Sequence, residues 1–89
     1  MKVYRVYSPF HQSDESGTYE YGIFSSREKA VERLKEIYKK EIKENPDYKF
    51  EFKPKRGALH IDDGFDIWSY YIEEFDVDEE IKRVNIGYT

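Results

Sequence analysis

The chain has 89 residues, a formal net charge of −4 and no cysteine, and its aromatic side chains are nine Tyr, six Phe and one Trp. This length leaves room for one domain, and the lack of cysteine excludes a disulfide framework and a thiolate metal site. Residues 1–8 do not resemble a signal peptide, and no apolar run is long enough to span a membrane, so we expect a cytoplasmic protein formed by a single domain, residues 1–89.

The first part of the chain predicts two strands joined by a loop. Residues 2–8 and 19–24 show the alternation of a β-strand, and residues 9–18 are rich in Pro, Gly and Ser, which is typical of a polar connection. Gly22 interrupts the second strand pattern. It therefore predicts a bulge or a close approach by another group.

A helix is predicted over residues 26–43. Ser25 is the expected N-cap, with Glu28 completing a capping box, and Asn45-Pro46 ends the helix. A single apolar stripe runs along it, formed by Ala30, Val31, Leu34, Ile37, Tyr38 and Ile42.

The second half of the chain predicts further strands. Residues 47–53 alternate as a strand, residues 54–57 and 62–65 have turn composition, and residues 66–77 form a long last strand. Residues 58–61 are an optional short return strand. Residues 81–86 are either a sixth strand or a docked tail.

These elements predict an α+β fold with an antiparallel sheet of 4–5 strands and one helix packed on one face, in the order β-β-α-β-(β)-β. The side chains expected to face the helix form the core. They are Tyr4, Val6, Tyr21, Ile23, Ala30, Leu34, Ile37, Tyr38, Phe50, Phe52, Trp68, Tyr70 and Ile72.

One helix leaves the other sheet face uncovered. This face is expected to carry Val3, Arg5, Tyr7, Phe24, Ile67, Ser69, Tyr71, Glu73, Phe75 and Val77. Such a surface is larger than a soluble monomer usually exposes. We favour a homodimer as its cover, over a ligand or partner protein and over the C-terminal tail, residues 84–88.

If a ligand covers this face, we expect it to be a nucleotide-like small molecule. Aromatic rings stack on a planar base and Arg side chains bind phosphates, so the expected ligand-binding residues combine both types. They are Arg5, Tyr7, Arg56, Trp68 and Tyr71.

An alternative uses the acidity of residues 62–80, which hold nine carboxylates and no basic side chain. A row of carboxylates suits a protein-interaction module, either an inhibitor of a host protein or a nucleic-acid mimic. The expected partner-binding residues are Glu73, Glu74, Phe75, Asp76 and Glu79.

Other classes of site are not expected. Asp62, Asp63 and Asp66 surround Gly64 but do not match the spacing of a calcium loop, so neither a metal nor another cofactor is predicted. The two histidines, His11 and His60, belong to no catalytic motif, and no catalytic residue is assigned. Lysines of the helix alternate with glutamates, which argues against direct nucleic-acid binding.

The segments YGIFSSREKAVERLKEI and YYIEEFDVDEE together resemble a family of short uncharacterised domains from bacteria and phages. The residues that carry the resemblance are Gly22, Ile23, Phe24, Ser25, Ser26, Glu28, Ala30 and Leu34, followed by residues 71–77. The resemblance implies a phage-type accessory protein in the host cytoplasm. The family brings no function with it. Because small phage proteins of this size often act by binding, we expect an anti-defence inhibitor that sequesters a nucleotide-like signal or blocks a host protein, and the lack of a catalytic motif argues against an enzyme.

Overall fold

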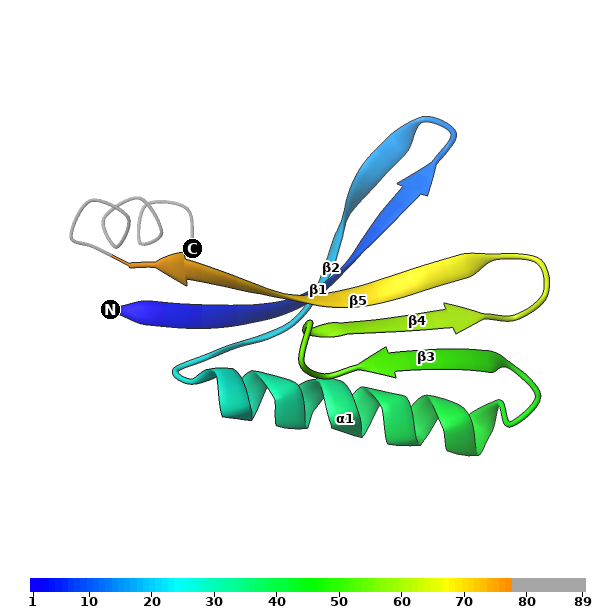
Figure 1. Cartoon of the computed structure of the whole chain (residues 1–89). Coiled ribbons are helices and arrows are strands. Elements are labelled where there is room, and N and C mark those ends of the chain that lie inside the picture. The colour runs from blue at the N-terminus through cyan, green and yellow to red at the C-terminus, as the bar shows by residue number, and fades with distance from the viewer. Residues whose placement is uncertain (78–89) are drawn as a thin grey trace.

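A computed structural model describes residues 1–77 and shows one antiparallel sheet with one helix (Figure 1). The elements are β1 Lys2–Gln12, β2 Glu15–Phe24, α1 Arg27–Glu44, β3 Lys49–Lys53, β4 Ala58–Asp62 and β5 Ile67–Asp76. The strand order in the sheet is β2-β1-β5-β4-β3. The predicted α+β class is confirmed, and the optional strand is β4, which makes the order β-β-α-β-β-β. Residues 81–86 and Glu79 lie outside the described residues.

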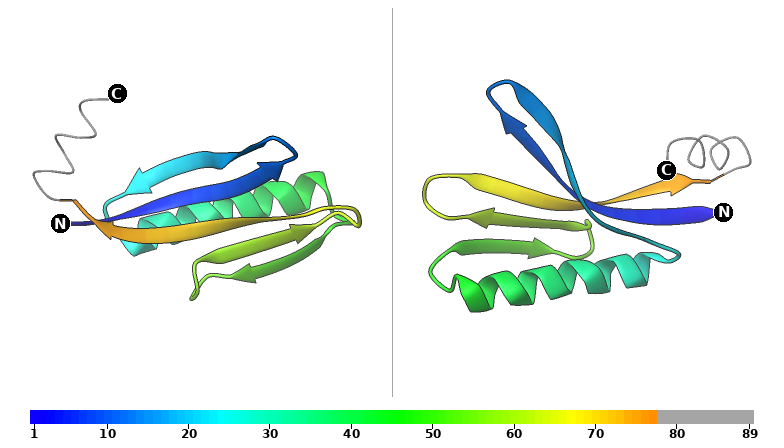
Figure 2. Two further views of the ribbon diagram at one scale, coloured as in Figure 1. Left: turned by 90° about the horizontal axis from the view of Figure 1, so that it is seen from above. Right: turned by 180° about the vertical axis from the view of Figure 1, so that it is seen from behind.

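Helix α1 connects the two edge strands of the sheet, β2 and β3, and packs against one face only (Figure 2, left). Val6, Leu34, Leu59 and Ile61 are fully buried between the two layers. Burial of Tyr70 in the same cluster raises the pKa of its hydroxyl to about 12. This cluster confirms most of the predicted core, except that Ile23 is 63% exposed. None of the described helices is long and apolar enough to cross a membrane.

The N-cap of the helix lies one residue later than predicted. Ser26 is extended, and its hydroxyl accepts a hydrogen bond of 3.2 Å from the backbone N–H of Lys29. The prediction that Ser25 caps the helix is therefore wrong, and so is the capping box with Glu28, because Lys29 occupies the position three residues after the cap.

We expect Ser26→Ala to lower the free energy of unfolding by about 1 kcal/mol, because it removes the acceptor for a first-turn N–H group. Ser25→Ala is the matched control and is expected to stay within about 0.5 kcal/mol of the parent protein. Urea unfolding of the three proteins checks this. A larger loss in Ser25→Ala than in Ser26→Ala would contradict the assigned cap.

A bulge in β2 explains the misplaced Ile23. The pairing of β1 with β2 shifts register between Arg5 and Tyr7, opposite Gly22, which has a φ of 127°. The extra residue reverses the alternation at the end of β2. Ile23 therefore lies opposite Arg5, on the face away from the helix, and Phe24 packs against the core. The predicted bulge at Gly22 is confirmed, but the faces assigned to Ile23 and Phe24 are wrong.

The predicted loop over residues 9–18 is largely β-structure. β1 continues to Gln12 and β2 starts at Glu15, so the two strands form a ribbon that projects from the sheet. Figure 1 and the right view of Figure 2 both show this ribbon diverging from β5. The glycine that suggests a loop has a packing role in this segment. The ring of Phe10 lies over Gly17, and a Cβ added to Gly17 would lie 3.0 Å from that ring.

Candidate binding surfaces

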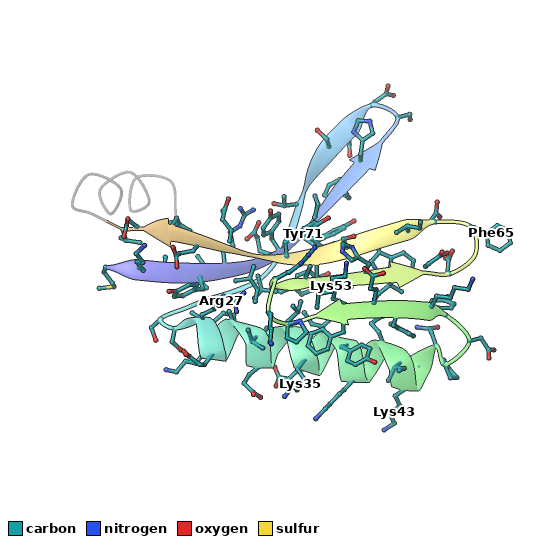
Figure 3. The ribbon with its side chains drawn as sticks, viewed as in Figure 1. Arg27, Lys35, Lys43, Lys53, Phe65 and Tyr71 are labelled. Atoms are coloured by element: carbon teal, nitrogen blue, oxygen red, sulfur yellow. The ribbon has the colours of Figure 1, made fainter. Side chains whose placement is uncertain are left out.

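The sheet surface opposite α1, called the open face below, is formed by alternate residues of all five strands. Strand register places Tyr7 opposite Tyr71 at its centre, and Tyr71 opposite Ala58. Figure 3 labels Tyr71 and Lys53 in this central region of the sheet. The members that matter for binding are Val3, Arg5, Tyr7, Glu20, Ile23, Lys49, Glu51, Lys53, His60, Asp62, Ser69, Tyr71, Glu73 and Phe75.

Arg5 is the centre of a hydrogen-bonded ion cluster on the open face. Its Nε and Nη2 donate to the two carboxylate oxygens of Glu20 at 2.8 and 2.6 Å, and its Nη1 donates to Glu73 at 3.0 Å. The guanidinium also lies 4.2 Å from the centre of the Tyr7 ring. The Arg5 hydrogen bonds lower the pKa of Glu20 to about 2 and raise the pKa of Arg5 above its usual range. All three guanidinium nitrogens of Arg5 thus already donate hydrogen bonds within the chain.

This cluster predicts an acid-dependent stability. The depressed pKa of Glu20 means that its ion pair stabilises the fold above about pH 4.5 and that this contribution is lost as the pH falls towards 2. Because the Glu20 side chain is 51% exposed, we expect Arg5→Gln to cost only about 1 kcal/mol at pH 7. The difference between Arg5→Gln and the parent is expected to shrink at pH 2.5. Urea unfolding at both pH values checks this, with Lys40→Gln as a helix control. An equal difference at both pH values would contradict it.

The structure divides the five predicted ligand-binding residues among three places. Arg5, Tyr7 and Tyr71 lie together, with 5.8 Å between the centres of the two tyrosine rings. Trp68 is on the helix side of the sheet, where its ring meets the edge of Tyr48 at 6.1 Å between centres. Arg56 is in the β3–β4 turn.

The β3–β4 turn forms a second candidate site. A shallow hollow of about 460 Å³ lies beside it, lined by Lys53, Pro54, Lys55 and Arg56. The helix holds this turn in place, because Arg27 donates a hydrogen bond of 2.8 Å to the carbonyl oxygen of Lys55. Figure 3 labels Arg27 at the first turn of the helix. The predicted turn over residues 54–57 is confirmed, since the N–H of Arg56 donates to the carbonyl of Lys53.

Strand alternation also splits the predicted acidic surface. Glu73 and Phe75 lie on the open face, whereas Glu74 and Asp76 point to the helix side. Glu74 forms an ion pair of 3.1 Å with Lys2, and this hydrogen bond lowers the pKa of the Glu74 carboxyl. The cations of β1 thus neutralise two adjacent acids of β5 that looked unpaired in the sequence.

His60 and Ser69 form a contact that the sequence patterns did not predict. They are directly opposite each other on β4 and β5, and 2.6 Å separates Nδ1 of His60 from the hydroxyl of Ser69. Nucleophilic catalysis also requires a pocket and donors for an oxyanion. Because both residues lie within paired strands and the contact joins one strand to the next, we interpret it as a polar bridge between β4 and β5.

The aspartates of the β4–β5 turn have structural partners. Asp63 accepts hydrogen bonds of 2.8 Å from the N–H groups of Phe65 and Asp66, and these lower the pKa of its carboxyl. Asp62 accepts one from Gly64, which has a φ of 95°. The predicted turn is confirmed. Across residues 1–77, no group of three or more His, Asp or Glu side chains is arranged to hold a metal ion.

Comparisons with protein-family models, with curated proteins and with solved structures gave no match. The geometry and chemistry of the candidate surfaces themselves therefore carry the functional argument.

Proposed function

We propose that this chain is a small non-enzymatic binding protein that assembles as a homodimer through its open face. The observation that carries the proposal is that, within residues 1–77, the helix covers one face of a five-stranded sheet and no other element covers the second. The bare face displays Ile23 together with the partly exposed rings of Tyr7, Tyr71 and Phe75. Soluble monomers rarely expose a continuous patch of this kind.

The charge pattern of the open face favours a second copy as the partner. Three cationic and four anionic side chains contribute, namely Arg5, Lys49 and Lys53 with Glu20, Glu51, Asp62 and Glu73. Most are paired within the face: Arg5 with Glu20 and Glu73, and Lys53 with Glu51 at 2.6 Å. A charge keeps its partner when such a face is buried, which limits the cost of desolvation. Two identical, nearly neutral faces can therefore meet about a two-fold axis.

The oligomeric mass in solution tests this proposal. We expect sedimentation equilibrium at micromolar concentration to give twice the chain mass of 10.8 kDa. A stable interface typically buries roughly 800 Å² per partner, and association at micromolar concentration is compatible with burial of that order. A mass of one chain at all concentrations up to the millimolar range would contradict the proposal.

A nucleotide-like ligand on the open face is the second candidate. The stacked arrangement of Arg5 over Tyr7, with Tyr71 adjacent, favours it. One feature weighs against it: Arg5 already binds two carboxylates, so its charge is not free for a phosphate. We therefore rank it below the homodimer. A rise in melting temperature with mono-, di- or cyclic nucleotides, abolished by Tyr71→Ala, would reverse this order.

The acidic interaction module ranks third, because Glu73 and Glu74 are paired with Arg5 and Lys2 and point to opposite faces. A role as a phage-type inhibitor of a host factor rests on the family resemblance alone. It is compatible with a dimeric binding protein and stays a prediction.

A further inference from the structure

A notch separates the projecting part of the β1–β2 ribbon from the start of β5. It has a volume of about 640 Å³, within the range of ligand sites in proteins. Its lining residues come from both sides and are mostly apolar or aromatic: Pro9, Phe10, His11, Tyr19, Asp66, Ile67 and Trp68. Figure 1 shows the ribbon and β5 diverging around this region.

The direction of the backbone hydrogen bonds along β5 shows what faces the notch. The N–H of Ile72 donates to Gly57, on the β4 side, and the N–H of Val77 donates to Met1, on the β1 side. Backbone polar groups alternate in direction along a strand, so the odd-numbered residues of β5 turn theirs towards β1.

Ile67 and Ser69 of β5 therefore direct backbone groups to the side where β1 no longer pairs with β5. The pairing of β1 with β5 ends at Tyr7 opposite Tyr71. Beyond it, the N–H and C=O groups of Ile67 and the N–H of Ser69 face the notch, and the strand register of residues 1–77 assigns them no partner. This short backbone edge is of the kind that accepts an added strand.

Pro9 explains why β1 leaves β5 at this point. The next residue of β1 to face β5 after Tyr7 is Pro9, which has no N–H to donate. The hydroxyl of Ser8 takes its place by donating a hydrogen bond of 2.6 Å to the carbonyl of Ser69. Ser8 and Pro9 thus end the pairing of β1 with β5, and the notch begins where this pairing stops.

The side chains of the notch define what fits beside this edge. Phe10 and Tyr19 stack with 4.7 Å between ring centres, and Tyr19 is 53% exposed. Trp68 lines the same space, with Asp66 at its rim. The lining includes a carboxylate and neither Lys nor Arg, so it favours an apolar or aromatic group with a nearby positive charge over a phosphate.

We propose that the notch binds an extended peptide segment of a partner protein, which adds as a strand along the edge of β5 at Ile67 and Ser69. An apolar or aromatic side chain of the peptide packs against Phe10, Tyr19 and Trp68, and a Lys or Arg side chain lies beside Asp66. This is strand addition, in which main-chain hydrogen bonds supply affinity and side-chain contacts supply specificity. The site adjoins the open face at Ile67 and Ser69, but its aromatic lining comes from the β1–β2 ribbon and from Trp68 on the helix side, so it goes beyond the proposed dimer.

A displayed library of random nonapeptides, selected on the full-length protein, tests the site. We expect enriched peptides to alternate apolar with polar residues and to carry Lys or Arg. Their binding is expected to perturb the fluorescence of Trp68, the only Trp of the chain, and the amide resonances of Ile67 and Ser69. Asp66→Lys is expected to weaken the best peptide about tenfold or more. Asp47→Lys, at another exposed acid, and Ile23→Lys, on the open face, are the controls and are expected to leave its affinity unchanged.

The main-chain contribution has its own control. N-methylation of the peptide residue opposite Ile67 removes the donor to the Ile67 carbonyl and is expected to weaken binding at least tenfold, whereas N-methylation of the neighbouring residue, whose N–H faces away from β5, is not. The proposal is overturned if the selection enriches no peptide. It is also overturned if the enriched peptides bind Asp66→Lys as tightly as the parent protein, or if N-methylation at either position has the same effect.

Discussion

Ile23→Lys is expected to convert the homodimer into monomers, with a dimer dissociation constant raised about 100-fold, or roughly 2.7 kcal/mol. Ile23 is 63% exposed and lies on the open face beside Arg5, so a Lys there leaves the fold of the monomer intact. In a two-fold interface the substitution occurs twice, and each Lys places a desolvated cation near the Arg5 guanidinium of the cluster. Sedimentation equilibrium of parent and variant measures the change.

Phe65→Lys is the matched control for this experiment. Phe65 is 95% exposed at the tip of the β4–β5 turn, and Figure 3 shows it at the end of the sheet, away from Tyr71. We expect its replacement to leave the dimer unchanged. An equal loss of dimer in both variants would assign the association to general surface hydrophobicity and not to the open face.

Leu34→Ala is expected to cost about 2–5 kcal/mol of unfolding free energy, more than either Ser26→Ala or Arg5→Gln. Leu34 is fully buried and sits at the centre of the one apolar stripe that joins the helix to the sheet. A domain of this length has a stability of only about 5–13 kcal/mol, so this loss is a large share of the total. Circular dichroism during urea unfolding measures the loss.

Lys39→Ala serves as the control on the exposed side of the same helix and is expected to change the stability by less than about 0.5 kcal/mol. A loss below about 1 kcal/mol in Leu34→Ala would contradict the assigned core, because a fully buried leucine would then contribute no more than a surface residue.

Periodic apolar patterns predicted the fold best. The helical stripe around Leu34 and the strict alternation of Tyr48, Phe50 and Phe52 set both the elements and their buried sides. Errors arose where one residue changes the pattern. Gly22 inserts a bulge that moves Ile23 to the other face, and single-sequence periodicity does not mark where such an insertion falls. Residues 9–18 have loop composition yet form a two-stranded ribbon. Its two strands pair with each other, and neither has a buried face that would impose an apolar alternation.

The candidate sites were harder to predict, because their residues are brought together by strand order. The sequence does not reveal that β1 pairs with β5. Because of this pairing, Lys2 forms an ion pair with Glu74 and Arg5 forms one with Glu73. Residue chemistry alone predicts Trp68 and Arg5 in one site, although strand alternation places the two on opposite faces. Ser8-Pro9 was the one available signal for the notch, since a proline within a strand marks the place where a ladder ends.

Intermolecular nuclear Overhauser effects in a mixture of isotope-labelled and unlabelled protein measure most directly what covers the second face of the sheet. We predict contacts between copies that arise from Ile23, Tyr71 and Phe75 and are lost in Ile23→Lys. The absence of such contacts at millimolar concentration, or contacts confined to the side that carries α1, would show that the open face is not a dimer interface.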